Sequence, residues 1–528
     1  MRQGPSTTTT THAQGPGRRS LLLGAGAAVT AGLLTGVPAR ATTEVAGRGP
    51  RAYPFTLGIA SGDPLPDGVV IWTRLAPSPF EVGGGVGRGA HPVQWQVATD
   101  PGFTRVVRSG TAHAHPEYAH SVHVDVRGLA PDRDHWYRFR SAGHLSPVGR
   151  TRTAPRPGAP LDHLHLVTAS CQSLGAGFYH AWRDAAQDPA DLVYFAGDYV
   201  YEYAVNETSV RWPYTPALPD DYARETDTLD RFRQQYSVHK VDPDLQEAHR
   251  VSPWMVTWDD HEVRNDYDAF DPTQTQLRAN GYRAFWEHMP LRRPQLPDGA
   301  SARMHRRLTY GDLVRFHVTD SRQFRTTQLP GGTVLEGPAR RDPSRQMLGA
   351  EQEAWLLDGL GSGTTWDVMA NTVLFSRLDS GAGAVEQFST GQWDSYRVAQ
   401  QRVVDTVVDK QIGGFVVLTG DIHRNYHLDV LANFDDPSSA VVGVEFAGSS
   451  ISSGRDGSQT DAGLELRKAE NPHLRSADLW RGYLRCRITH DEWTTEVRAI
   501  DKVTTLEHRA WTSQTLRTFP GRPGLVVD

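Results

Sequence analysis

The chain has 528 residues, a formal net charge of -6, and apolar and charged fractions of 38% and 22%. This length is too great for one hydrophobic core and indicates a multi-domain globular protein, and the composition excludes a mainly disordered chain. The negative net charge differs from the strongly positive charge that is typical of nucleic-acid-binding proteins, so we expect no dedicated nucleic-acid partner.

Residues 1–41 have the pattern of an export signal. Arg18 and Arg19 precede an apolar segment rich in glycine and alanine, and an Ala-Arg-Ala cleavage site follows at 39–41. The paired arginines predict twin-arginine export; an ordinary secretory signal with two chance arginines is the alternative. No later segment has the roughly 18 uninterrupted apolar residues of a membrane span. We therefore expect a secreted, extracytoplasmic protein without a transmembrane segment.

Residues 53–155 predict a small all-β sandwich domain. Short strand-like runs at 69–73, 93–97 and 122–126 are separated by clusters of Gly, Pro and Asp. The Gly-Leu-Ala-Pro run at 128–131, which leads into a further strand-like run at 136–139, resembles the corner between two strands of fibronectin type III domains, which indicates a fibronectin type III or Ig-like sandwich. His135 takes the place of the usual tyrosine there. We assign this region an accessory or packing role.

From residue 161 to 528, apolar runs alternate with segments of helical period, which predicts an α/β domain. Two helices are expected at 350–357 and 396–408. Each of five apolar runs ends in ligand-type residues. These residues are Cys171, Asp198, Asp259 to Glu262, Asp320 to Arg322, and Asp421 to His423. We expect the strand ends to converge on one crevice, the usual place for a site in α/β sheets.

The segment 193–203 illustrates the pattern. A short apolar strand is followed by Gly197, which can turn the chain sharply, and by Asp198 and Tyr201, which lie close enough to share one ion. A carboxylate and a phenolate suit a hard trivalent cation. Of the two cysteines, Cys171 follows a strand in the same way and is expected to be a third ligand, whereas Cys486 fits an ordinary strand position. A disulfide between them is the alternative.

Three motifs carry a resemblance to a known superfamily. Gly197-Asp198-x-x-Tyr201, Asp259-Asp260-His261-Glu262 and Gly420-Asp421-x-His423 resemble, in order, the dispersed signature of binuclear metallophosphoesterases. With Cys171 in the first ligand position, and Tyr201 in the iron-binding position of purple acid phosphatases, the set is similar to the alkaline phosphatase D family, known as PhoD. The segments 258–267, 320–325, 348–356 and 445–448 add to the resemblance. Members of that family also have a preceding β-sandwich and a twin-arginine signal.

This resemblance implies an α+β layered metallophosphoesterase sandwich at 161–528 that hydrolyses phosphate esters with Fe(3+) and Ca(2+) as cofactors. The implied metal ligands are Cys171, Asp198 and Tyr201 for iron, and Asp260, Asp421 and His423, with Asp198 shared, for calcium. Which of the last three binds which ion stays open. Such metals clamp the phosphoryl oxygens and lower the pKa of a bound water, giving a hydroxide for in-line attack on phosphorus.

Three further residues are predicted to be catalytic. His261 is expected to contact phosphate and to protonate the leaving alkoxide, with a structural histidine as the alternative. Asn265 is expected to bind metal or phosphate, or else to cap a turn. Arg322 is expected to bind phosphate through two nitrogens, or else to form a structural ion pair. Glu262 is expected to orient ligands, and Asp259 to be structural.

Three functions follow from the sequence. The leading one is a secreted phosphomonoesterase with some diesterase activity on small phosphate esters. The nearest alternative is a phospholipase D-type phosphodiesterase, because secreted phospholipases D belong to the same family; its substrates would be phospholipid head groups, with peripheral contact to lipid. The third is a non-catalytic calcium-binding surface protein, against which the intact set of iron-type ligands argues.

Overall fold

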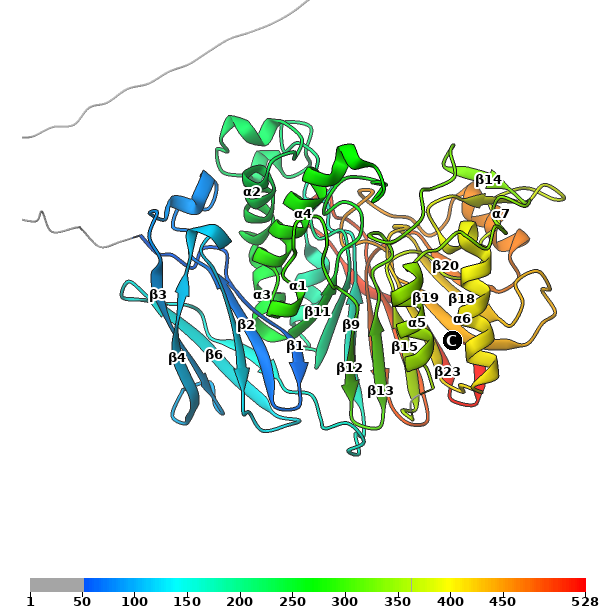
Figure 1. Ribbon diagram of the computed structural model, residues 1–528, viewed down its shortest axis with the longest axis horizontal. Helices are drawn as coiled ribbons and strands as arrows, with labels where there is room; N and C mark the ends of the chain where they lie inside the picture. The colour runs from blue at the N-terminus through cyan, green and yellow to red at the C-terminus, as the bar shows by residue number, and fades with distance from the viewer. Residues whose placement is uncertain (1–51, 362) are drawn as a thin grey trace, which may run out of the picture. The chain divides into compact units, whose positions relative to one another are not determined.

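Two mixed β-sheets form the centre of the computed structural model, which describes residues 52–361 and 363–528 (Figure 1). The predicted signal peptide, residues 1–41, lies outside the described residues. The first sheet contains β1 (Ile59–Leu65), β2 (Gly68–Arg74), β5 (Ser121–Arg127), β9 (Leu164–Ala169), β10 (Leu192–Ala196), β11 (Pro253–Thr257), β21 (Arg481–Ile488), β22 (Trp493–Ile500), β23 (Ala510–Phe519) and β24 (Arg522–Val527). The second contains β12 (Arg306–Tyr310), β13 (Val314–Val318), β15 (Trp366–Ala370), β17 (Phe415–Thr419), β18 (Asn425–Leu431), β19 (Val441–Ala447) and β20 (Leu474–Asp478).

Parallel strands lie at the centre of both sheets. In the first sheet the strands are ordered β24-β23-β22-β21-β9-β10-β11-β1-β2-β5, and β9, β10, β11 and β1 are parallel. In the second the order is β12-β13-β15-β17-β19-β18-β20, and β13, β15, β17 and β19 are parallel. Because the carboxyl ends of parallel strands meet at one edge, the residues that follow them can gather there.

The sheets pack face to face because their central strands are apolar on both sides. Along β10, Tyr194 and Ala196 enter the core between the sheets, whereas Val193 and Phe195 face the other way, into the core beneath the helices. Strands buried on both faces are continuous apolar runs in the sequence. For this reason β9, β10, β11, β13 and β17 could be predicted from the sequence.

Helices cover the outer face of each sheet (Figure 1). The first sheet is covered by α1 (His180–Ala186), α2 (Leu229–Lys240), α3 (Pro243–Val251) and α4 (Thr275–His288), and the second by α5 (Gly349–Gly359) and α6 (Arg397–Asp409); α7 (Ala462–Glu470) packs on β20. Thr228 and Asp242 begin α2 and α3 by accepting backbone N–H groups of the first turn. The two helices predicted from the sequence correspond to α5 and α6.

The predicted all-β region is present. Its strands β3 (His91–Ala98), β4 (Val106–Ala114), β6 (Asp134–Ser141), β7 (His144–Leu145) and β8 (Gly149–Arg152) pack on β1, β2 and β5. The region is not structurally separate, however, because β1 pairs with β11 and continues the first sheet. The sequence of β1, Ile-Ala-Ser-Gly-Asp-Pro-Leu, lacks the alternation that would have indicated this pairing. The fibronectin-like corner stays a prediction; at that corner, His135 Nε2 lies 3.5 Å from the carbonyl oxygen of Ala130.

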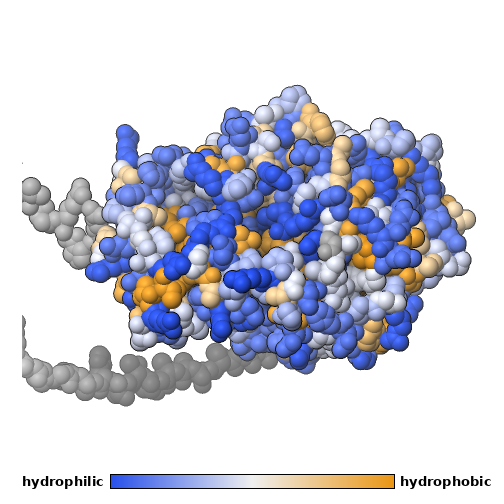
Figure 2. Space-filling model, turned by 60° about the horizontal axis from the view of Figure 1, so that its bottom comes forward, coloured by the Kyte–Doolittle hydropathy of each residue, from blue (hydrophilic) through white to orange (hydrophobic). Residues whose placement is uncertain are grey.

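Two remaining features concern the surface. A short two-stranded antiparallel sheet pairs β14 (Thr333–Leu335) with β16 (Gln387–Ser389). On the face shown in Figure 2, apolar side chains form separate patches among polar ones, as is usual for protein surfaces. Within the described ranges, no helix combines the length and the apolar character that crossing a membrane requires.

Candidate active site

The predicted metal ligands come together where the parallel strands end. Cys171 follows β9, Asp198 follows β10, Asp260 follows β11, and Asp421 and His423 follow β17. Three overlapping groups have ligand atoms within 4.8 Å of one another: Cys171, Asp198 and His423; Asp198, Asp260 and His261; and Asp259, Asp260 and Asp421. Strands of both sheets therefore contribute to one site.

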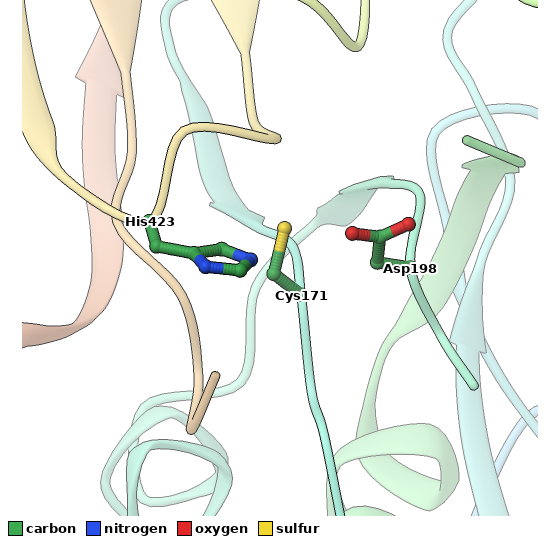
Figure 3. A group of neighbouring side chains, drawn as sticks. All are labelled: Cys171, Asp198 and His423. Atoms are coloured by element: carbon green, nitrogen blue, oxygen red, sulfur yellow. The ribbon is translucent and has the colours of Figure 1, made fainter. Parts of the chain in front are cut away.

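The first group combines a thiol, a carboxyl and an imidazole, and the phenol of Tyr201 lies beside it. Asp198 and His423 point toward Cys171 from opposite sides (Figure 3). The Tyr201 hydroxyl lies 3.0 Å from Asp198 Oδ2 and 3.1 Å from His423 Nε2. The three donors that the sequence predicted for iron are thus neighbours, and His423, which was predicted for the calcium part of the site, lies beside them.

The backbone is held in an unusual conformation at the ligands. Cys171, Asp198, Asp421 and His423 have φ values of 59, 58, 64 and 53°. Residues other than glycine rarely adopt this left-handed region, and such strain concentrates at functional sites. Gly197, with φ 83°, allows β10 to approach β11 closely, because a Cβ there would lie 2.4 Å from Asp259 Cβ.

Glu262 connects two of the turns that carry predicted ligands, as expected for the orienting role that the sequence indicated. Its buried carboxylate accepts the backbone N–H groups of Asp198, Tyr199 and Asp259 at 3.2, 2.7 and 2.8 Å. The turn after β10 is therefore fixed relative to the turn after β11.

Arg322 lies among the aspartates of the second part of the site. Its buried guanidinium donates to both oxygens of Asp259 at 2.5 and 2.7 Å and to Asp421 at 2.6 Å, and it lies 3.4 Å from Asp260. The other oxygen of Asp421 accepts from Gln392 at 2.5 Å. The arrangement is that of an ion-pair network, and a contact between Arg322 and phosphate stays a prediction.

His261 and Asn265 lie on the turn after β11. Glu202 Oε2 is 2.7 Å from His261 Nδ1, and Glu202 Oε1 accepts the backbone N–H of Asn265 at 2.8 Å. The side chain of Asn265 is exposed, and its amide lies 3.4 Å from Asp266. Sequence reasoning missed Glu202, whose only signal was its position next to Tyr201.

Burial dominates the protonation of the site. It raises the pKa of Asp198, Cys171 and Tyr201 well above the usual ranges, and neighbouring acidic groups add to this effect. Burial also raises the pKa of Asp421, to about 7, against the opposing charge of Arg322. Thiol, phenol and carboxyl must all lose protons to bind a cation, and only a strongly charged ion can compensate so many buried anions. The donor set therefore fits a multivalent metal centre.

Comparison with known proteins identifies the family. A model of the PhoD-like phosphatases matches residues 166–497, and a model of the N-terminal domain of PhoD-like phosphatases matches residues 40–155. The chain belongs to the PhoD-like phosphatase family. Alkaline phosphatase D of Bacillus subtilis (strain 168) is 40% identical over 498 residues, 92% of this chain and 85% of that protein. A solved structure described as "Structure of PhoD" is 39% identical, with a TM-score of 0.86 over 90% of this chain and 92% of that one.

As a PhoD-like phosphatase, the protein is a metal-dependent hydrolase of phosphoric ester bonds. The family and the reaction class predicted from the sequence are confirmed, as is a mixed α/β fold with an N-terminal all-β region. A non-catalytic calcium-binding protein is therefore set aside.

Proposed function

We propose that the protein releases phosphate from phosphomonoesters, with some activity on diesters, at a centre of ferric iron and calcium. The observation that supports this most is the meeting of Cys171, Asp198 and Tyr201, a buried thiol, carboxyl and phenol from two strand ends. Thiolate sulfur and phenolate oxygen are suitable ligands for iron(III). His423 is a fourth neighbour of this iron group.

Calcium is assigned to the carboxylate-rich part of the site. Asp260 and Asp421, with Asp198 shared between the two parts, would offer oxygen ligands, which calcium prefers over nitrogen. When bound, the metals would stabilise negative charge on the phosphoryl oxygens and lower the pKa of a nearby water. Arg322 would hold the carboxylates in place by balancing their charge.

His261 is proposed to give a proton to the leaving alkoxide. The Nδ1 contact with Glu202 fixes the ring and leaves Nε2 for that transfer. Burial opposes a charge on the imidazole, but the carboxylates of Asp198, Glu202 and Asp260 outweigh it and raise the pKa to about 10. The Glu202 carboxylate, which is not among the proposed metal ligands, favours the acid form of the ring. Asn265, with its exposed amide beside this group, would contact a substrate oxygen.

Metal analysis of the purified protein tests the ligand assignment, with a second cysteine as a matched control. We expect iron and calcium, and we expect Cys171→Ser to lose iron and nearly all activity. Cys486 is also buried, but it lies in β21 and contacts Thr495. Cys486→Ser should therefore keep both iron and activity. Zinc alone in the wild type, or iron retained by Cys171→Ser, would show that the assignment is wrong.

The alternative substrate class is a phospholipid. A phospholipase D-type enzyme would cleave phosphatidylcholine and touch a lipid surface, whereas a phosphomonoesterase would turn over p-nitrophenyl phosphate much faster. The ratio of kcat/KM for these two substrates, measured on one preparation, separates the two functions. Preference for the lipid would replace our leading proposal.

We also infer that residues 1–41 direct twin-arginine export, so that the ester substrates are extracytoplasmic. Replacing Arg18 and Arg19 by lysine should retain the precursor inside the cell. The wild-type protein recovered from the medium should begin after Ala41, which N-terminal sequencing would verify. Equal export of the lysine variant would favour the ordinary secretory route.

A further inference from the structure

A serine-rich segment crosses the end of β9 beside the first group of ligands. This segment, residues 449–453, follows β19. Ser450 forms an isolated parallel bridge with Ser170, and the N–H of Ile451 donates to the carbonyl oxygen of Ser170 at 3.0 Å. The segment is therefore fixed against the turn that presents Cys171. Nothing in its sequence predicted a role at the site.

Ser453 lies between this turn and the phenol of Tyr201. Its Oγ is 2.7 Å from Tyr201 Oη and 2.8 Å from the carbonyl oxygen of Cys171, and it accepts the backbone N–H of Ser173 at 3.0 Å. The residue is 1% exposed. The hydroxyl thus contacts one predicted iron ligand directly and the backbone of another.

The Ser453 hydroxyl has one proton. It can therefore donate a hydrogen bond either to Tyr201 or to the carbonyl oxygen of Cys171. That carbonyl also lies within reach of the N–H groups of Ser452 and Ser453, at 3.4 and 3.3 Å, so it keeps partners when the hydroxyl turns away. A phenolate is the stronger acceptor, because hydrogen bonds to charged groups are about twice as strong as neutral ones. Once Tyr201 is ionised, the proton points to its oxygen.

On the basis of the iron centre proposed above, we propose that Ser453 is a positioning residue. It donates a hydrogen bond to the Tyr201 phenolate and so changes the electron donation from Tyr201 to the iron. Such a bond draws electron density from the phenolate oxygen and weakens its donation to iron(III). It therefore raises the energy of the phenolate-to-iron charge-transfer transition and the reduction potential of the iron. It also holds the Tyr201 ring in the orientation that binding needs.

The experiment compares Ser453→Ala with Ser452→Ala in iron-loaded protein. Removing the Ser453 hydroxyl should move the phenolate charge-transfer band to longer wavelength, lower the reduction potential and weaken iron retention about 10- to 100-fold. The hydroxyl of Ser452 donates instead to the carbonyl of Ser173 at 2.8 Å, so its removal should leave the band in place. Resonance Raman scattering from the phenolate ring identifies the band, and Ser453→Thr, which keeps a hydroxyl, should restore the wild-type position.

The outcomes distinguish the two proposals. A wild-type protein without a phenolate band, or one in which Tyr201→Phe keeps the band, overturns the iron centre and this inference with it. A wild-type band that Ser453→Ala leaves at the same wavelength overturns the inference alone, as does an equal shift in Ser452→Ala. If the alanine variant does not fold, Ser453→Gly removes the same hydroxyl and must give the same shift.

Discussion

Replacing Gly197 by alanine tests the close approach that shapes the site. The new Cβ would lie 2.4 Å from Asp259 Cβ and 2.6 Å from the backbone nitrogen of Asp259, closer than real contacts allow. Overpacking of this kind costs about 1–3 kcal/mol, and the positive φ costs about 1–2 kcal/mol for alanine. Reduced entropy of the unfolded chain returns about 0.4–1 kcal/mol. We expect a net loss of about 1–5 kcal/mol.

The loss should be accompanied by a loss of metal. Relief of the clash would move the end of β10 from β11 and displace Asp198 from Asp260, so the metal content should fall together with activity. Urea unfolding followed by tryptophan fluorescence gives the free energy, and elemental analysis gives the metals. Gly299→Ala is the control, since it has φ 58° with nothing within 4 Å of the new Cβ. It should lose about 1 kcal/mol and no metal. Equal losses for the two variants would refute the steric argument.

Three further predictions address the site and the core. Arg322→Gln should lower the free energy of unfolding by about 3–5 kcal/mol, because it leaves Asp259 buried without its ion-pair partner; a raised KM with unchanged stability would instead indicate a phosphate contact. Glu202→Gln should lower kcat about 10²-fold for alkyl phosphates and less for aryl phosphates, because His261 loses its orienting carboxylate; equal losses for both leaving groups would exclude this role. Burial lowers the pKa of Lys240 to about 7. At this lysine the unfolded chain therefore binds more protons between pH 7 and about 10, so the free energy of unfolding of the wild type, measured relative to Lys240→Met by urea unfolding, should rise with pH in this range.

The sequence predicted the parts of the fold whose signal is local. Strands such as β10 and β17 are buried on both faces, so they stand out as short apolar runs, and each is followed at once by a ligand-type residue. Asp198 and Asp421 were recognisable for that reason. The helices α5 and α6 were predicted because their apolar residues recur at helical spacing.

Features that depend on distant partners left no such signal. The pairing of β1 with β11 joins residues 61 and 253, and the contact of Ser453 with Tyr201 spans 252 positions. The choice between phosphate binding and ion pairing for Arg322 likewise depended on which carboxylates surround it. Residue types at one position cannot specify contacts of this kind, because they arise only when separate strand ends meet.

We expect the strained backbone at four predicted metal ligands to contribute to the selectivity of the site. Holding four non-glycine residues in the left-handed region costs about 4–8 kcal/mol in total, at about 1–2 kcal/mol each. The hydrogen bonds of Glu262 to the turn after β10 and those of residues 449–453 to the turn after β9 offset the part of this cost that falls on Asp198 and Cys171. The fold therefore fixes the positions of the donors in advance. A cation that needs another spacing could bind these predicted ligands only by breaking those bonds, so we expect donor chemistry at set distances to select the ion.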